Sequence, residues 1–578
     1  MNSLLNEPSL QLTILFFFIP VFFALILVLI KINAIISNVL RKKELKKIYE
    51  NLNNLQPEEI SALEKRKREL EFKLTGDELS SNRAVEDPRG LVDQTNEIHD
   101  IRFLKTKRKE ERNTIAIPKN EKKIILWFLG CSVLWLIIGT TVGEYLGIKF
   151  VAPDADHVSW LSFGRLRPVH TNIVFWGWAS VAMVGFSYYV IPRVGNTKIF
   201  SPKIAYTSLI LMNSAVLLGS ICLMAGINNS GGEYREYIWP VMLLFALGII
   251  ISIYNHIKTI AARKTEEIYV SNWYIVSAMM FVVVILLVAY LPFWQDGLGE
   301  TITQGYFMHQ GVGMWFMFFN LGLMYYFLPQ ELNSPVYSYS LSILAFWTQI
   351  LFYTLIGTHH FIFSAIPWWM QTIAIVASVG MIIPVAAGSI NFMMTVRGSW
   401  HRLKFSYILP FYIVSIIFYF TGSMQGTVEA FRITNLVWHF TDFTVAHSHL
   451  TMYGIITFML WSFTYTLVPR LTSHEPPSLT VGLHFWLALV GLLVYTVSLM
   501  IGSTEKGILW MDKKPFLDSV ILMVPYWLWR AIGGTMMWIS HFIFAYNFYR
   551  MIKPKKEIKI PQSPTELLDI INSEKTTA

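Results

Sequence analysis

The sequence predicts an all-α protein that crosses a membrane many times. Of its 578 residues, 54% are hydrophobic and only 15% are charged, whereas soluble domains carry roughly 25% charged residues. Apolar runs of about 20 residues, the length that spans a bilayer, recur from residue 123 to residue 551. These runs are continuous and do not alternate with polar residues, which excludes a membrane β-barrel.

Twelve apolar runs fill the region from 121 to 552, and we expect each to form one transmembrane helix. The predicted spans are 123–147, 168–192, 204–226, 236–256, 271–292, 307–328, 340–360, 371–396, 406–424, 440–468, 481–503 and 524–550. A thirteenth run at 12–37 lacks the positive segment that opens a signal peptide, so we interpret it as a retained anchor helix. The expected divisions are an anchor at 1–40, a charged cytoplasmic linker at 41–120, a twelve-helix domain at 121–552 and a cytoplasmic tail at 553–578.

Basic residues gather in loops on one side of the predicted bundle. If the helices alternate in direction, these loops are 193–203, 256–263, 397–404 and 550–559, together with the linker. By the positive-inside rule this side is cytoplasmic, which places the N-terminus outside and the C-terminus in the cytoplasm. The net charge of +9 therefore reflects topology among membrane lipids and does not indicate nucleic-acid binding.

Two histidines one residue apart, His447 and His449, lie in the first turns of a long apolar run. Successive residues of an α-helix are rotated by about 100°, so these two side chains point about 200° apart. One helix would therefore offer one imidazole to each of two sites on its opposite sides. Two buried metal centres beside one membrane helix suggest electron transfer between them.

Six of the 14 histidines fall at the outer ends of predicted helices. They are His170, His309, His359, His360, His447 and His449. Any one of them alone is more often a hydrogen-bonded or interfacial side chain, but ionisable residues at membrane depth are costly, and six at one level indicate function. Two imidazoles complete a six-coordinate haem iron, one leaves an open face on a second haem, and three suit a copper ion. An open haem iron facing such a metal would bind and reduce a small diatomic molecule.

At this point the sequence resembles the haem–copper oxidase superfamily, specifically the catalytic subunit of cbb3-type cytochrome c oxidases. The resemblance covers about 120–550, so that 121–552 would be the catalytic domain. The motifs that carry it are SFGRLRPVHTN at 162–172, MYYFLP at 324–329, PVYSYSLS at 335–342, YTLIGTHH at 353–360, HFTDFTVAHSH at 439–449 and RAIGG at 530–534.

The resemblance implies a ligand set for each metal. His170 and His449 would be the axial ligands of a low-spin haem b, and His447 would be the proximal ligand of a high-spin haem b. The copper ligands would be His309, His359 and His360.

Tyr353 matches the active-site tyrosine of the family, which is linked to the first copper histidine and supplies an electron and a proton for O–O cleavage. It precedes His360 by seven residues, two turns of a continuous helix, so the two side chains would share a face. Arg165 and Arg167 suit haem propionates by charge. The alternative for this pair is a role as interfacial loop residues.

A polar stripe on the helix at 340–360 predicts a proton path from the cytoplasmic side. Its residues are Tyr339, Ser342, Thr348 and Gln349, leading to Tyr353. The path resembles the K-like channel of the family, and the alternative is helix–helix hydrogen bonding. Three positions depart from the family. Gln425 replaces a glutamate, with Glu429 the nearest acid, while Ala345 and Asn320 replace a histidine and a threonine of the path; these changes bear on pumping and on the substrate.

The resemblance implies reduction of O2 to water coupled to proton movement, in a bacterial cytoplasmic membrane. Because the chain has no Cys-x-x-Cys-His motif for covalently attached haem, the electrons would come from membrane-anchored c-type cytochrome subunits. One alternative is a nitric oxide reductase with non-haem iron in place of copper, but such enzymes have a glutamate ligand at the position of Gly313 and lack the tyrosine. A second alternative is a haem b electron conduit or a transporter.

Overall fold

The computed structural model describes residues 19–34, 36–37, 40, 117–229, 231–294, 296–404 and 406–553. All regular secondary structure in these residues is helical, which confirms the all-α prediction. The thirteenth apolar run is described as a helix over Ile19–Ala34, which is shorter than the 18 residues that every long span reaches. Its role as an anchor and the four domain boundaries stay predictions. Most of the expected linker, and the tail after 553, lie outside the described residues.

In the described part of the chain, twelve helical spans are long and apolar enough to cross a membrane, which confirms the twelve-helix bundle. Its first half contains α6 (Lys119–Val151), α7 (Phe163–Asn172), α8 (Ser180–Val194), α9 (Pro202–Ala225), α10 (Trp239–Ala261), α11 (Val270–Tyr290), α12 (Leu298–Gln310) and α13 (Phe318–Leu332). Its second half contains α14 (Tyr339–Tyr353), α15 (Trp368–Gly380), α16 (Ile382–Val396), α17 (Leu409–Glu429), α18 (Arg432–Trp438), α19 (Phe443–His449), α20 (Phe458–Thr472), α21 (Ser478–Met511) and α22 (Phe516–Ile552).

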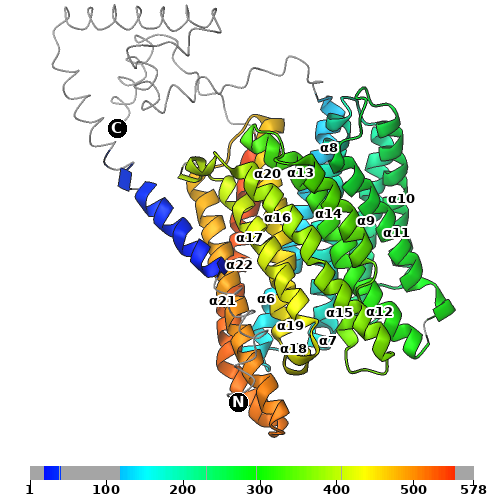
Figure 1. The fold of residues 1–578 in the computed structure, drawn as a ribbon, viewed down its shortest axis with the longest axis vertical. Helices are drawn as coiled ribbons and strands as arrows, with labels where there is room; N and C mark the ends of the chain where they lie inside the picture. Colours follow the sequence, from blue (N-terminus) through cyan, green and yellow to red (C-terminus); the bar gives the residue numbers. More distant parts are fainter. Residues whose placement is uncertain are drawn as a thin grey trace, which may run out of the picture. The chain divides into compact units, whose positions relative to one another are not determined.

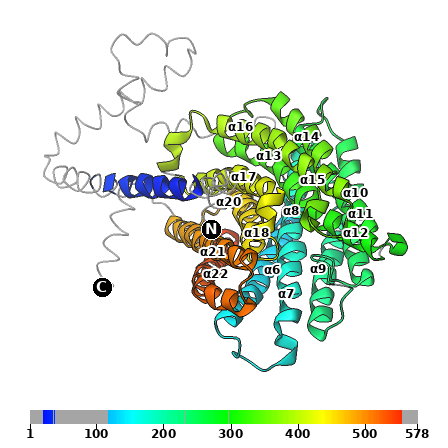
Figure 2. The ribbon, with the colours of Figure 1, turned by 60° about the horizontal axis from the view of Figure 1, so that its bottom comes forward.

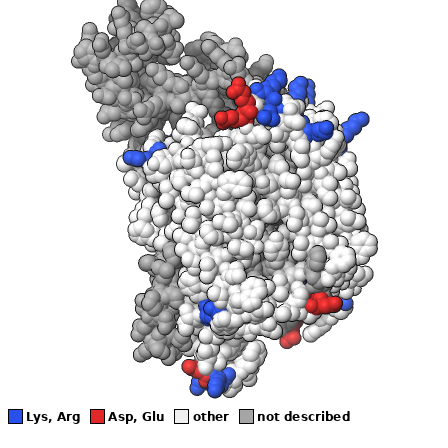
Figure 3. Space-filling view, turned by 45° about the vertical axis from the view of Figure 1, so that its right-hand side comes forward, with Lys and Arg blue, Asp and Glu red and all other residues white. Residues whose placement is uncertain are grey.

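The two ends of the bundle differ in the residues they carry. The ends of α8 and α16 and the segments that follow them, with Arg193, Arg397 and Lys404, lie at the top of Figure 1, and we call this the basic end. The opposite end, where α7, α12, α18 and α19 are labelled, is the site end. Figure 3 shows charged side chains near both ends of one face, with uncharged side chains across the band between them, as a membrane environment requires.

Four spans form the centre of the bundle. The most apolar stretch of each is 83% to 94% buried in α7–α8, α12–α13, α17 and α19–α20, against 22% to 56% in the other eight. Figure 2, which brings the site end forward, shows α8, α17 and α20 toward the middle, with α9, α10, α14 and α22 around them. Four of the six candidate histidines, His170, His309, His447 and His449, belong to these central spans, so the fold places them away from lipid.

Each central histidine helix loses its regular α-helical turn just after the histidine. π-helical stretches run over Ile173–Ala179, Gly311–Met317 and Leu450–Thr457, directly after α7, α12 and α19. Such insertions occur mostly at functional sites, because the wider turn re-aims the residues around it. The three distortions therefore mark one level of the bundle, close to His170, His309 and His449.

Candidate functional site

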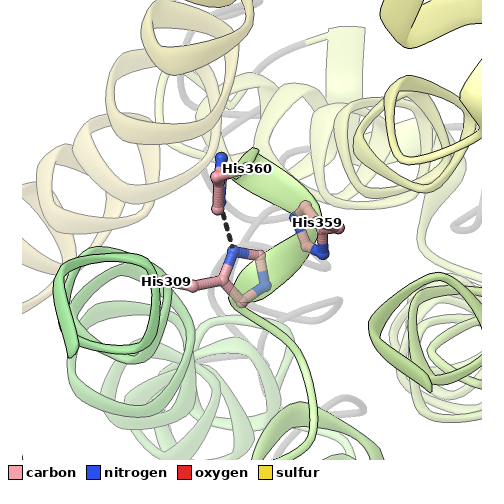
Figure 4. A group of neighbouring side chains, drawn as sticks. All are labelled: His309, His359 and His360. Carbon is pink, nitrogen blue, oxygen red and sulfur yellow. Dashed lines mark hydrogen bonds between the residues drawn. The ribbon is translucent and has the colours of Figure 1, made fainter. Parts of the chain in front are cut away.

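Three histidines from two segments meet at the site end (Figure 4). His309 comes from the last turn of α12, and His359 and His360 come from a 3-10 turn over Thr358–Phe361. Their ligand nitrogens all lie within 4.8 Å of one another, and His309 Nδ1 is 2.9 Å from His360 Nε2. Imidazole nitrogens bind a metal ion at about 2.0–2.1 Å, so a small shift brings all three onto one ion.

Tyr353 lies against this cluster, but for a different reason from the one its spacing predicted. The prediction that Tyr353 and His360 share a helical face is wrong, because α14 ends at Tyr353. The chain then turns through Gly357, whose φ of +144° interrupts any helix. The phenol ring instead stacks on His309, with ring centroids 4.7 Å apart and an angle of 18° between the planes. Gln310, which the sequence analysis missed, holds the turn by donating to the Tyr353 carbonyl oxygen at 2.6 Å.

Gly313 faces the ring of Tyr353 so closely that no side chain fits there. A Cβ atom at Gly313 would lie 1.7 Å from ring carbon Cζ and 2.2 Å from the hydroxyl oxygen of Tyr353. The phenol therefore occupies the space that a side chain at position 313 would need. A glutamate ligand at 313 and this position of Tyr353 exclude each other.

A cavity of about 500 Å³ is lined by the three-histidine cluster, Tyr353 and His447. This volume falls in the range of about 300–1,000 Å³ that is usual for ligand and cofactor sites. His447 Nδ1 lies 3.0 Å from Gln425 Oε1, which leaves Nε2 for the cavity. A Cβ atom at Gly426 would lie 3.1 Å from His447 Nε2, so this glycine makes room for the ring.

A second cavity, of about 420 Å³, is lined by His170 and His449. His170 Nδ1 donates to the Gly139 carbonyl oxygen at 2.7 Å, and His449 Nδ1 donates to that of Val445 at 2.8 Å. A carbonyl oxygen only accepts, so in both rings the proton is on Nδ1 and Nε2 is left as a metal ligand. Histidines that bind metals are typically oriented by such a bond.

The two cavities lie on either side of α19. His447 lines the first and His449 the second, as their spacing predicts, while Val445 and Ser448 line both. The segment from His447 to His449 thus connects the two cavities covalently.

Two arginines, one on α7 and one on α22, line the cavities. Arg167 lines both cavities and pairs with Glu233 at 2.8 Å. Arg165 donates to the Met224 carbonyl oxygen at 3.0 Å and is not among the residues that line either cavity. Arg530, to which the sequence analysis gave no role, lines the second cavity, and its guanidinium lies 4.2 Å from the ring of Phe150. An arginine in the middle of an apolar run was the available signal.

The predicted polar path is divided between two faces of α14. Ser342 and Gln349 are buried, and Gln349 Nε2 donates to the Gly313 carbonyl oxygen at 3.3 Å. Thr348 is half-buried and its hydroxyl donates to the Leu344 carbonyl oxygen, while Tyr339 is half-buried near the surface. The buried face gains polar neighbours that the sequence analysis missed, because they come from other helices. They are Tyr274, Tyr325, Asn391 and Tyr419.

Comparison with known proteins identifies the family. The sequence profile described as cytochrome c and quinol oxidase polypeptide I matches residues 123–536. The chain belongs to this haem–copper oxidase subunit I family. It is 32% identical to the cbb3-type cytochrome c oxidase subunit CcoN1 of Stutzerimonas stutzeri, over 77% of this chain and 98% of that protein. It is 30% identical to cytochrome c oxidase subunit 1 of Rhodobacter capsulatus, over 73% of this chain and 84% of that protein.

A solved structure of a heme-copper terminal oxidase dimer has the same fold as this subunit I, with a TM-score of 0.64 over 79% of this chain and 90% of that one. Its sequence identity is 17%, so this likeness concerns the fold alone. The family implies haem and copper, and the donors fit both. Two imidazoles with carbonyl-bonded Nδ1 atoms line one cavity, and three converging imidazoles line the other. The subunit is thus a multi-pass membrane protein of the cytochrome c oxidase class.

We predict that the buried carboxyl group of Glu236, in the loop before α10, makes the stability of the folded protein depend on pH. Burial raises the pKa of this carboxyl from 4.5 to about 7, although Asn172 donates to it at 2.8 Å. Between about pH 4.5 and 7 the folded protein therefore keeps a proton that the unfolded chain releases, so stability falls as pH rises through this window and levels off above it. In Glu236→Gln, the decrease in the free energy of unfolding across this pH window should be smaller by roughly 2–4 kcal/mol.

The measurement is the melting temperature of the purified protein in detergent from about pH 5 to pH 8. The control is Glu266→Gln, which changes an exposed acid and should leave the profile of the parent unchanged. A Glu236→Gln profile parallel to that of the parent would contradict the assignment.

Proposed function

We propose that this subunit reduces dioxygen to water in the cavity between His447 and the three-histidine cluster. His309, His359 and His360 would hold copper, His447 a high-spin haem b, and His170 with His449 a low-spin haem b. When bound, haem iron and copper supply the open coordination site and the electrons that oxygen reduction needs. The observation that carries the proposal is the phenol of Tyr353 stacked on a copper-ligand candidate at the cavity wall.

Tyr353 would supply a proton and an electron from its hydroxyl group. Its ring is held by the contact with His309 and by the bond from Gln310 to its carbonyl oxygen. The protons consumed would enter from the basic end along the buried face of α14, through Ser342 and Gln349. Gln349 Oε1 is buried and has no hydrogen-bond partner among the described residues, which supports a water molecule or a passing proton at this point.

A nitric oxide reductase with non-haem iron is less well supported. Iron in such a site needs a carboxylate ligand, and the metal-binding group found in the described residues consists of histidines alone. Position 313 has no room for a glutamate while Tyr353 is in place. Three imidazoles without a carboxylate favour copper. An open cavity beside these histidines also argues against a passive electron conduit or a transporter.

The electron donors would be membrane-anchored c-type cytochrome subunits that approach the site end, where the second cavity lies. The basic end would face the cytoplasm, because Lys and Arg concentrate on the cytoplasmic side of bacterial inner membranes. This orientation puts proton uptake and electron entry on opposite sides of the bundle. Reduction of oxygen would then separate charge across the membrane even without pumping.

Metal analysis of the purified protein tests the proposal directly. We expect copper and haem iron in a ratio of about one to two, because three imidazoles suit one copper ion and the other three serve two haems. Consumption of O2 and of NO should be measured on the same sample. Iron in place of copper, together with NO consumption, would overturn the oxidase assignment.

Tyr353→Phe should reduce oxygen consumption at least about 100-fold, because the cavity loses its proton-donating hydroxyl. Both haems should remain bound, since the ring that packs on His309 is kept. Absorption spectra and an oxygen electrode provide the two measurements. Turnover at the parental rate would rule out a catalytic role for this tyrosine.

Gly143→Ala should abolish the low-spin haem spectrum while the high-spin haem stays. A Cβ atom at this position would lie 2.4 Å from His170 Cε1, so the ring must leave its place. Gly130→Ala is the matched control on α6, because its Cβ would meet only Phe548 Cε1 at 3.9 Å and the residue does not line the second cavity. Reduced-minus-oxidised spectra separate the two haems, and an intact low-spin signal in Gly143→Ala would argue against His170 as a ligand.

A further inference from the structure

Two oxygen atoms from α17 approach the same nitrogen of His447. Gln425 Oε1 lies 3.0 Å from Nδ1, and Glu429 Oε1 lies 3.3 Å from it. The two side chains are four residues apart on one helix, so they project from the same face. Because Nδ1 carries a single proton, the two oxygens compete for one hydrogen bond.

The other contacts of these side chains make the competition uneven. Gln425 is buried and its Nε2 donates to Met500 Sδ at 3.2 Å, which turns its carbonyl oxygen toward His447. Glu429 Oε1 is buried and has no hydrogen bond of regular geometry within the described part of the chain. A buried oxygen left in this state costs about 1–3 kcal/mol, and more if it is charged. The N–H of His447 is the donor within reach that would relieve this cost.

We propose that Glu429 is a positioning residue that sets the electron density of His447 by competing with Gln425 for its Nδ1 proton. The proposal rests on the proposed function, in which His447 holds the high-spin haem. A shift of a few tenths of an ångström would shorten the Glu429 contact to an ordinary charge-assisted bond, which is about 2.7–2.9 Å long. Gln425 would then be the weaker, neutral acceptor.

The two acceptors have different effects on the ring. A carboxylate that accepts from Nδ1 makes the ligand nitrogen Nε2 more basic, as partners behind a metal-bound histidine do generally. A more basic ligand stabilises the oxidised metal and lowers its reduction potential. A neutral amide that accepts the same hydrogen bond makes Nε2 less basic than a carboxylate does, and it lowers the reduction potential less. Which of the two side chains of α17 accepts the hydrogen bond from His447 Nδ1 therefore controls how readily the high-spin haem accepts an electron.

The experiment uses the complete haem-loaded protein and two readouts, redox titration of both haems and the iron–histidine stretching frequency of the reduced high-spin haem. Glu429→Gln should raise the reduction potential of the high-spin haem by about 59 mV. This shift corresponds to a change of about tenfold, toward the high-spin haem, in the equilibrium constant for electron transfer between the haems. The stretching frequency should fall, because the bond to the carboxylate is lost. The low-spin haem should keep its potential and serves as the internal reference.

A charge swap separates the hydrogen bond from the electric field of the carboxylate. In Gln425→Glu combined with Glu429→Gln, the carboxylate moves to the position 3.0 Å from Nδ1, and both readouts should return to or beyond their parental values. Gln425→Glu alone should lower the potential and raise the frequency, and it keeps the test valid if Glu429→Gln fails to fold. Glu266→Gln removes a distant exposed charge and should change neither readout.

Two outcomes would overturn the proposal. The first is an unchanged potential and frequency in Glu429→Gln with both haems bound. The second is a potential shift with no change in frequency, which would mean that Glu429 acts through its charge and not through the N–H of His447. A parent protein without a high-spin haem would instead refute the proposed function, so the two failures are distinguishable.

Discussion

A histidine buried at membrane depth needs a hydrogen-bond acceptor for the proton on Nδ1, and its Nε2 atom is then left to face a cavity. His170 and His449 donate theirs to backbone carbonyl oxygens, and His447 finds an amide and a carboxylate. These bonds determine the ring orientations, and the ring orientations determine which cavity each histidine faces. In a low-dielectric interior an unpaired N–H is costly. The arrangement of α6, α7, α17 and α19 therefore follows from the need to satisfy these donors.

Glycine provides the space that the rings need. His170 lies where a Cβ atom of Gly143 would be, Tyr353 lies where one of Gly313 would be, and His447 closely approaches Gly426. Each of these glycines stands on a helix next to the one that carries the ring. The π-helical stretches after α7, α12 and α19 add a second adjustment, because they rotate the following helix relative to the site.

The chemistry of the first cavity depends on which group stands next to the three-histidine cluster. A phenol in contact with His309 and a carboxylate at position 313 are alternatives that cannot coexist in this backbone. The chain has the phenol, and an acid of α17, Glu429, lies 3.3 Å from His447 Nδ1. In the proposed function, the phenol of α14 and the acid of α17 that contacts His447 therefore have separate roles on different helices.

The sequence by itself determined the twelve spans, the level of the six histidines and the opposite directions of His447 and His449. These are local properties, since hydrophobic length and the 3.6-residue period need no knowledge of neighbouring helices. Only the tertiary structure decided that α14 stops at Tyr353, that the phenol stacks on His309, that Arg530 lines the second cavity and that Asn391 bonds to Ser342. It also decided that Glu429 reaches His447. Each of these depends on a contact between helices that are distant in the sequence, and no periodicity within a single helix specifies such a contact.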